Sequence, residues 1–258
     1  MTKFYINGFS AFTGDVPTEQ FAPYVETRRL RRMENMAKNA LFCSFEALKQ
    51  AGLPLEQPKN MGLSVAVGAG SLENTCKFRD SILDDGDELS SPTAFAGSVH
   101  NSTGLALSIF LQLQGPCVTS GQFEASFPAA FLTATSFLEK KMCESVLVVV
   151  ADDINRVAQS YAPAHPDLFV NRLRNPQGPF ERKSAAFVLS ITPSGKDPFE
   201  VTRIEFKRSA DDLSATVNPL YLAQHAVKLL QEKNTFKLED SFGFTQFVLE
   251  ATPYVKPQ

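Results

Sequence analysis

A strand-to-helix junction within residues 115–141 constrains this chain more than any other stretch. A Gly-Pro turn leads into a short β-like run, Cys117–Ser120, and then into apolar residues that recur at steps of three and four, the spacing of one helical face. Pro128 lacks a backbone N–H, which is tolerated only in the first turn of a helix, so we expect the helix to begin near Glu124 or Ala125. Glu124 then lies at the helix N-terminus, where unpaired backbone N–H groups point outward. Several enzymes place a nucleophile at this position after a strand; here the residue is a carboxylate.

Charge and cysteine usage exclude several classes of protein. The 25 Lys and Arg residues nearly balance the 28 Asp and Glu residues, which argues against a nucleic-acid partner or an anionic membrane. The four cysteines show no C-x-x-C spacing, so we expect reduced thiols and neither a disulfide framework nor a metal site, and we predict no cofactor. The first residues are too few and too polar for a signal peptide, and no apolar run approaches membrane-spanning length. We therefore expect a cytoplasmic protein.

The predicted elements alternate between strand and helix. Residues 145–151 form a continuous apolar run of the kind that is buried on both faces of a sheet. The segments 184–191 and 200–207 read as two strands joined by a turn, which suggests that they pair antiparallel. The whole order is β-α-β-α-β-α-β followed by β-β-α-β, which is typical of a layered α/β domain with a mostly parallel sheet. We expect residues 1–258 to form a single domain.

One stretch resembles a known family. The phrase SPTAFAGSVHNSTGLALSIFLQLQGP at Ser91–Pro116, the junction after it and the order of elements resemble the N-terminal half of the β-ketoacyl-acyl-carrier-protein synthases, members of the thiolase superfamily. The resemblance implies a layered thiolase-like half-fold, βαβαβαββ, with a mostly parallel sheet and antiparallel last strands.

The resemblance also implies that this chain does not catalyse condensation. Counting from Gly115-Pro116, the family's active-site cysteine falls on Glu124, and a carboxylate cannot form the thioester through which a synthase holds its acyl chain. The second half of a synthase brings two catalytic histidines and an HGTGT-like motif. This chain has only His100, His165 and His225, and none of them lies in such a motif.

Inactive relatives that pair with an active synthase are known as chain-length factors, and this chain looks like the small subunit of aryl polyene and xanthomonadin-type biosynthesis. The resemblance implies pairing with a full-length β-ketoacyl synthase, as a heterodimer or a dimer of heterodimers, and contact with an acyl carrier protein through that complex. Half of a two-lobed core would leave apolar surface for the partner to cover. The strand before the nucleophile pairs across the dimer axis in this family, and the acyl tunnel is closed by large side chains. These positions fall on Cys117, Val118, Thr119, Ser120 and Gly121 for the interface and on Phe95, Phe123 and Phe127 for the tunnel.

Plainer readings compete with each of these assignments. Glu124 could simply be a favourable charge at a helix N-terminus, or the catalytic base of a stand-alone acyl-thioester decarboxylase or hydrolase. Each phenylalanine could be an ordinary core residue, and the protein could be a structural scaffold of the synthase. His100 reads as a structural histidine. The basic cluster Arg28, Arg29, Arg31 and Arg32 is more typical of a solvated face than of a docking site for an acidic carrier protein.

Overall fold

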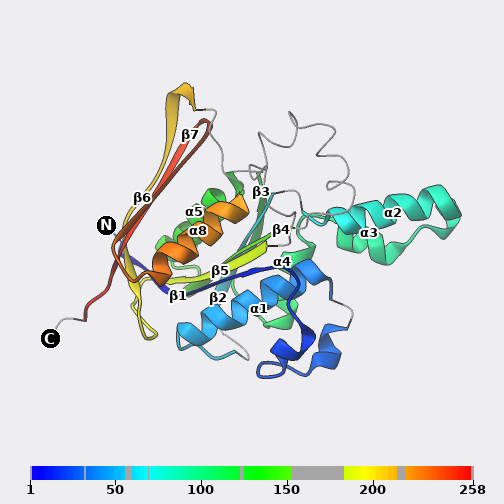
Figure 1. The fold of residues 1–258 in the computed structure, drawn as a ribbon, viewed down its shortest axis with the longest axis horizontal. Coiled ribbons are helices and arrows are strands. Elements are labelled where there is room, and N and C mark those ends of the chain that lie inside the picture. The colour runs from blue at the N-terminus through cyan, green and yellow to red at the C-terminus, as the bar shows by residue number, and fades with distance from the viewer. Residues whose placement is uncertain are drawn as a thin grey trace.

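The fold is taken from a computed structural model, which describes residues 2–31, 33–55, 60–68, 70–122, 125–152, 183–213 and 219–256. Its centre is a seven-stranded mixed sheet in the order β3-β2-β4-β5-β1-β6-β7 (Figure 1). The strands are β1 (Phe4–Thr13), β2 (Met61–Val67), β3 (Cys117–Gly121), β4 (Ser145–Asp152), β5 (Lys183–Ser190), β6 (Phe199–Leu213) and β7 (Phe236–Pro253). The helices are α1 (Asn35–Gln50), α2 (Leu72–Asp85), α3 (Pro92–Ser98), α4 (Ser102–Phe110), α5 (Ser126–Glu139) and α8 (Pro219–Gln231), with short 3₁₀ turns η1 (Thr18–Phe21), η2 (Thr27–Leu30) and η3 (Asp87–Leu89).

The prediction of an α/β layered fold is confirmed, but that of a mostly parallel sheet is wrong. Among the described strands the pairs β3–β2 and β2–β4 are parallel, whereas the pairs β4–β5, β5–β1, β1–β6 and β6–β7 are antiparallel. The reason is that β5 runs antiparallel between β4 and β1. Strands that are linked through helices and point the same way are therefore not all neighbours in the sheet.

The expected pairing of the two segments after residue 183 is also wrong. β5 and β6 do not pair with each other, because β1 lies between them and pairs antiparallel with both. The first strand of the chain is thus a central strand. The turn that connects β5 to β6 passes across the end of β1. Asn7 of β1 anchors this turn: its Nδ2 donates to Thr192 O (3.0 Å) and its Oδ1 accepts from Ser194 N (3.0 Å).

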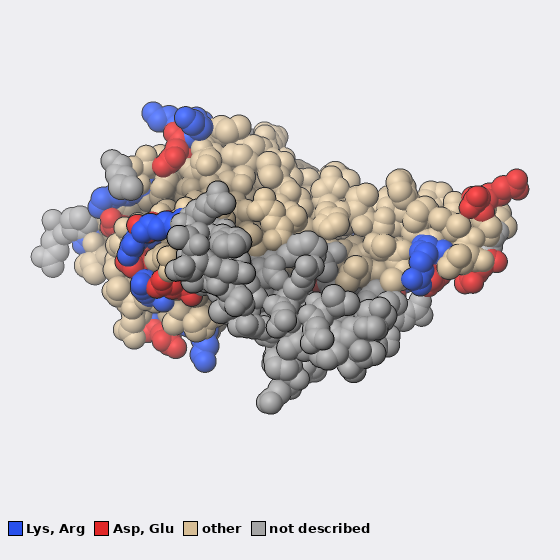
Figure 2. Space-filling view, turned by 90° about the horizontal axis from the view of Figure 1, so that it is seen from above, with Lys and Arg blue, Asp and Glu red and all other residues tan. Residues whose placement is uncertain are grey.

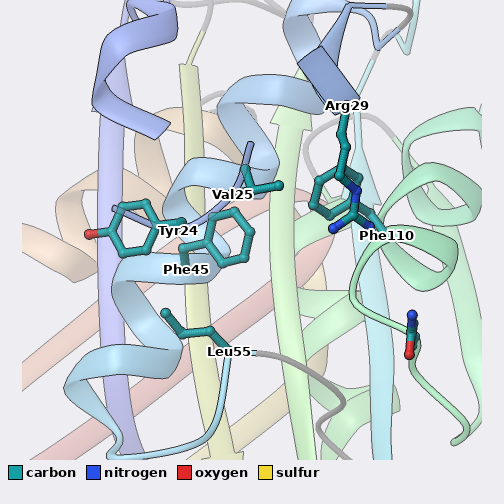
Figure 3. A pocket seen from close by; sticks show the side chains of 7 residues that line it. Tyr24, Val25, Arg29, Phe45, Leu55 and Phe110 are labelled. Atoms are coloured by element: carbon teal, nitrogen blue, oxygen red, sulfur yellow. The ribbon is translucent and has the colours of Figure 1, made fainter. Parts of the chain in front are cut away.

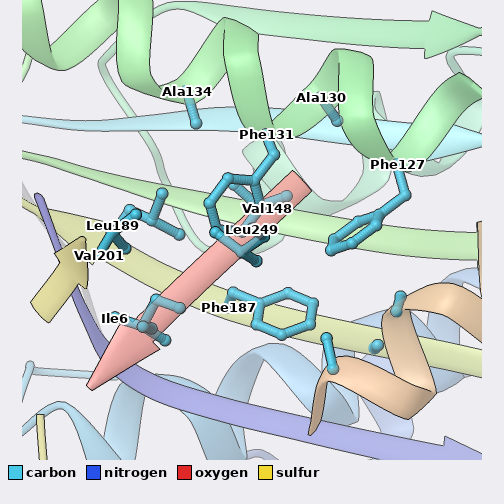
Figure 4. Packing of buried hydrophobic residues seen from close by; sticks show 14 of the residues in the cluster. Ile6, Phe127, Ala130, Phe131, Ala134, Val148, Phe187, Leu189, Val201 and Leu249 are labelled. Atoms are coloured by element: carbon cyan, nitrogen blue, oxygen red, sulfur yellow. The ribbon is translucent and has the colours of Figure 1, made fainter. Parts of the chain in front are cut away.

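The strands β4 and β5 alternate their side chains between two cores, as the apolar run at 145–151 predicted. Leu147 and Val149 pack with α1 and α4 on one face, whereas Val146 and Val148 pack with α5 and α8 on the other. Phe127 and Phe131 of α5 point down onto the sheet in this second core (Figure 4).

The long antiparallel strands β6 and β7, together with the helix α8 that lies between them in the sequence, close the second core from the same chain. Phe247 of β7, fully buried, meets the Phe127 ring with centroids 6.2 Å apart. Leu222, Ala226 and Leu230 of α8 complete the cluster beside α5. The apolar side of α5 is therefore covered within this chain, and the surface left for a partner must lie elsewhere.

Two helices project from the opposite end of the molecule. α2 and α3 pack on each other and extend away from the sheet (Figure 1), with the Phe78 and Phe95 rings 5.1 Å apart. Ser91 caps α3 by accepting a hydrogen bond from Ala94 N (3.2 Å), and Pro92 occupies the first helical position, where its missing N–H costs nothing. Among the described residues, no helix is long and apolar enough to cross a membrane.

Candidate functional site

The turn between β3 and α5 is fixed by one serine. Ser126, fully buried in the first turn of α5, donates from Oγ to Val67 O (2.8 Å) and accepts from Gln122 N (2.8 Å). Ala125 N donates to Gln122 O (3.0 Å), which tightens the same turn. The helix begins at Ser126, within two residues of the predicted start. The predicted site residues Phe123 and Glu124 lie outside the described residues.

The carboxyl ends of the three parallel strands meet beside this turn. Val67 of β2 is in register with Gly121 of β3, and Asp152 ends β4 on the other side of β2. The buried Asp152 carboxylate accepts a hydrogen bond from Gly70 N (2.7 Å), so the loop after β2 is tied to the end of β4. Ligands of α/β proteins bind at this edge of the sheet, and the β3–α5 turn lies there.

His100 packs over two glycines at this edge. A Cβ atom on Gly70 would come within 3.3 Å of His100 Cδ2, and one on Gly121 within 3.2 Å. Gly70 also has φ +75°, a conformation that only glycine adopts readily. The ring thus lies beside the β3–α5 turn. The sequence analysis gave His100 a structural role and missed this location, because no spacing pattern connects residue 100 with residues 70 and 121.

The described side chains at this edge do not form a nucleophilic centre. Cys117 begins β3 at its far end from the turn, and burial raises the pKa of its thiol. Burial also raises the pKa of Cys43 to about 12, so this thiol is protonated at neutral pH. The Ser126 hydroxyl is committed to two backbone groups. The described residues contain no group of His, Cys, Asp and Glu that could hold a metal ion.

An exposed apolar surface lies next to this edge, and we call it the α3–α4–β3 face. Leu105 and Ile109 of α4, four residues apart and so on one side of the helix, are 57% and 67% exposed, whereas Leu107 is buried. Phe95, Val99 and Val118 extend the face onto α3, the turn after it and β3. The sequence contains no Asp, Glu, Lys or Arg from Leu89 to Phe123. Charged side chains gather at the β6–β7 end and at the far end of the α2–α3 projection (Figure 2).

The predicted interface strand lies at an edge of the sheet. β3 carries all five predicted interface residues, Cys117, Val118, Thr119, Ser120 and Gly121, and among the described residues it pairs only with β2. Its outer backbone edge is therefore available to another strand. The sequence analysis missed Leu105 and Ile109, because a leucine at helical spacing does not reveal which side of the helix faces the core.

The candidate tunnel residues Phe95 and Phe127 lie in different surroundings. Phe95 is 55% exposed on α3, within the α3–α4–β3 face, where its side chain is accessible to a partner. Phe127 is fully buried among the rings of Phe131, Phe187 and Phe247, at centroid distances of 5.6, 5.5 and 6.2 Å. The described residues show no contact between Phe95 and Phe127.

A family model matches most of the described chain. The model of the β-ketoacyl synthase N-terminal domain matches residues 15–172, which include α1 to α5 and the β3–α5 turn. No curated protein matches the sequence.

Solved structures share the fold at low sequence identity. The ketosynthase–chain length factor of ishigamide biosynthesis matches with a TM-score of 0.62 at 16% identity, over 81% of this chain and 68% of that one. A type II polyketide ketosynthase complex with its acyl carrier protein matches with a TM-score of 0.77 at 11% identity, over 98% of this chain and 99% of that one. The complex of the ketosynthase ApeO with its chain length factor ApeC from Xenorhabdus doucetiae matches with a TM-score of 0.61 at 16% identity, over 97% and 100%.

Proposed function

Because the chain belongs to the family of β-ketoacyl synthase N-terminal domains, we propose that it is a non-catalytic subunit of the chain-length-factor type. It pairs with an active β-ketoacyl-acyl-carrier-protein synthase in the cytoplasm and shapes the acyl tunnel of that partner. The observation that carries this proposal is the α3–α4–β3 face, an exposed, charge-free apolar surface that is continuous with the edge strand β3.

The absence of catalysis rests on the residue at the nucleophile position. Glu124 takes the place of the cysteine to which a synthase attaches its acyl group, and a carboxylate forms no thioester. Cys117 does not replace it, because it lies at the opposite end of β3 and burial raises the pKa of its thiol. The acyl chain is therefore held by the partner.

Pairing is supported by the exposed surface. A helix that is apolar on its outer as well as its inner side is normally buried, and α4 carries Leu105 and Ile109 outward with Leu107 inward. The similar structures include chain length factors that are solved together with ketosynthases, which gives the arrangement that we propose here. The polyene or polyketide character of the product is part of the same proposal.

The tunnel role falls on Phe95, Phe123 and Phe127. Of the two that the structure describes, Phe95 is exposed to a partner and Phe127 is buried. A large side chain that reaches the end of the partner's acyl tunnel limits chain length sterically, and a smaller one permits a longer chain. Residues 1–258 would act as one domain in this role.

The direct test is co-expression with the synthase, followed by size-exclusion chromatography and analysis of product length. We expect a stable complex. Phe95→Ala should lengthen the products or broaden their length distribution, and the complex should stay intact. Leu83→Ala is the matched control. Leu83 is 72% exposed on α2, so this substitution also truncates an exposed apolar side chain, but one outside the proposed face.

Other results would overturn the proposal. If the chain alone hydrolysed or decarboxylated acyl thioesters and Glu124→Gln abolished the reaction, the chain would be an independent enzyme. If the complex formed but no substitution at the three phenylalanines changed product length, the chain would be a structural scaffold.

A further inference from the structure

The helical projection formed by α2 and α3 has few buried side chains. Among the described residues of these two helices, Cys76 and Ala94 alone are buried. Phe78 on α2 is half-buried, and Phe95 on α3 is 55% exposed. Because the projection extends away from the sheet (Figure 1), the direction of an exposed side chain on α3 depends mainly on the contacts between the two helices.

Aromatic side chains in the body of the molecule are held from more than one side. Phe45, which is 2% exposed, stacks on Tyr24 with ring centroids 5.0 Å apart and meets Phe110 edge-on at 6.3 Å (Figure 3). Phe95 has one aromatic neighbour among the described residues. This is Phe78, with ring centroids 5.1 Å apart and an interplanar angle of 52°. The orientation of the Phe95 ring therefore rests on a single aromatic contact.

Two serines connect the backbone positions that carry these two rings. The Ser81 hydroxyl donates to Phe78 O (2.7 Å) and accepts from Ser91 N (3.0 Å). Ser91 O in turn accepts from Phe95 N (3.0 Å). This series of hydrogen bonds runs from one phenylalanine to the other, so it fixes their backbones relative to each other.

The other end of α3 is fixed by a close approach at Gly97. A Cβ atom there would lie 2.1 Å from Asn74 Nδ2 and 2.2 Å from Glu34 Oε1, so a larger residue would push α3 away from α2. The Glu34 carboxylate also accepts from Ser71 Oγ (2.9 Å), which ties the start of α2 to the start of α1. Because α3 is held at both ends, the freedom left to Phe95 lies in its side chain.

We propose that Phe78 is a positioning residue for Phe95. Its ring restricts the rotamers of the Phe95 side chain and so sets how sharply this subunit limits the length of the partner's acyl chain. This inference rests on the proposed tunnel role of Phe95. An aromatic pair favours the arrangement in contact by roughly two- to tenfold. Without Phe78 the Phe95 ring would occupy more rotamers, and some of them would let longer chains pass.

The first test uses the isolated chain and does not depend on the synthase. A para-fluorophenylalanine replaces Phe95, and its fluorine resonance is measured by NMR. We expect Phe78→Ala to move this resonance toward its position in the urea-unfolded chain, because the fixed neighbouring ring is gone. Leu83→Ala is the matched control. Leu83 is 72% exposed and follows Phe78 by five residues, about 140° around α2, so its truncation should leave the resonance unchanged.

The second test co-expresses the chain with the synthase and measures product length. Phe78→Ala should raise the share of products above the wild-type length by about two- to tenfold, with the complex intact. Phe78→Tyr keeps the ring and should keep the wild-type distribution. Phe78→Leu fills the space without a ring and serves where the alanine variant has a lowered unfolding midpoint. The double variant Phe78→Ala, Phe95→Ala should match Phe95→Ala alone, because a residue that acts through Phe95 has no effect once that ring is removed.

Different results overturn the positioning role and the proposed function. An unchanged fluorine resonance in Phe78→Ala would show that the Phe78 ring does not hold Phe95. Additive effects in the double variant would show that Phe78 contacts the acyl chain or the partner by itself. If Phe95→Ala changed product length and Phe78→Ala did not, the positioning role would fall and the proposed function would stand. If Phe95→Ala itself changed nothing, the tunnel role would fall and the positioning role with it.

Discussion

Phe127, in the first turn of α5, and Phe247, in β7, meet edge-to-face with ring centroids 6.2 Å apart and an interplanar angle of 76°. These residues are 120 positions apart in the sequence, and both are fully buried. Their contact joins the helix α5 to the C-terminal strand β7. β7 thereby covers the inner side of α5 within the same chain.

We predict that Phe247→Ala destabilises the chain by about 3–5 kcal/mol, because it opens a cavity beside the Phe127 ring in a closed core. Urea unfolding followed by circular dichroism measures this loss as a lower midpoint. Phe95→Ala is the control: Phe95 is 55% exposed, so the same change in side chain should cost far less. Equal losses of stability at the two positions would show that β7 does not close the core.

The α3–α4–β3 face makes a prediction about assembly. Ile109→Glu places a charge at the centre of the proposed interface, where an unpaired carboxylate loses its water. We expect the complex with the synthase to weaken by about a hundredfold or more in a pull-down or titration. The isolated variant should keep its unfolding midpoint, since Ile109 is 67% exposed.

Val255→Glu is the matched control for this substitution. Val255 is 83% exposed and follows β7, at the opposite edge of the sheet from β3. The Val255→Glu substitution should leave the affinity for the synthase unchanged. A complex that tolerated Ile109→Glu but not Val255→Glu would move the interface to the other end of the sheet.

The edge of β3 makes a second prediction about assembly. Leu63 N donates to Pro116 O (2.8 Å), and in a parallel ladder this phase directs the N–H of Val118 toward β2 and that of Thr119 outward. Thr119→Pro should therefore leave the β2–β3 pair in place, because proline is tolerated on an edge strand whose N–H faces away from the sheet. We expect it to weaken the synthase complex at least about tenfold through the lost donor and the altered edge.

Two further variants define that experiment. Thr119→Val keeps the β-branched shape and the backbone N–H, and it should bind the synthase like the wild type. Val118→Pro removes an N–H that points to β2, so it should lower the unfolding midpoint of the isolated chain. Normal complex formation by Thr119→Pro would exclude a strand pairing across this edge.

The sequence predicted the local elements well where a pattern is local. The steps of three and four after residue 125 located α5, and the continuous apolar run at 145–151 located β4 between two cores. The assignment of the nucleophile position to Glu124, by counting from a Gly-Pro turn, stays a prediction, because Glu124 lies outside the described residues. Each of these inferences depends on neighbours within one element.

Strand order and surface exposure could not be predicted in the same way. The insertion of β5 between β1 and β4 is a contact between segments that are more than 170 residues apart, and side-chain alternation is the same in parallel and antiparallel strands. Leu105 and Ile109 resemble core residues in the sequence, because an apolar interface uses the same side chains as an interior. The contact of His100 with Gly70 and Gly121 is likewise visible only in three dimensions.

The ion pairs of Glu205 on β6 make a prediction about pH. Hydrogen bonds from Arg203 and Lys207 hold the pKa of Glu205 at about 2, below its ordinary 4.5. A carboxylate with a lowered pKa contributes stability that is present above its unfolded pKa and is lost as the pH falls through its folded pKa. The unfolding midpoints of wild type and Glu205→Gln should therefore differ at neutral pH and converge between about pH 4.5 and pH 2. Because the group is exposed, the difference should shrink in high salt; a difference that grew on acidification would contradict the ion-pair assignment.

Cys117 reports on the proposed interface without any substitution. It is the exposed cysteine of the chain's described residues and begins β3, whereas Cys43, Cys76 and Cys143 are buried. Since burial raises the pKa of the Cys117 thiol, iodoacetamide should modify it slowly at neutral pH and faster as the pH rises. Binding of the synthase should protect it, because the start of β3 would then be covered. Mass spectrometry of the alkylated peptide, with and without the synthase, measures this protection, and Cys43 should react only after unfolding. Unchanged labelling of Cys117 in a complex that chromatography shows to be intact would place the synthase on another surface, because a thiol at the start of a covered edge strand cannot keep its full access to the reagent.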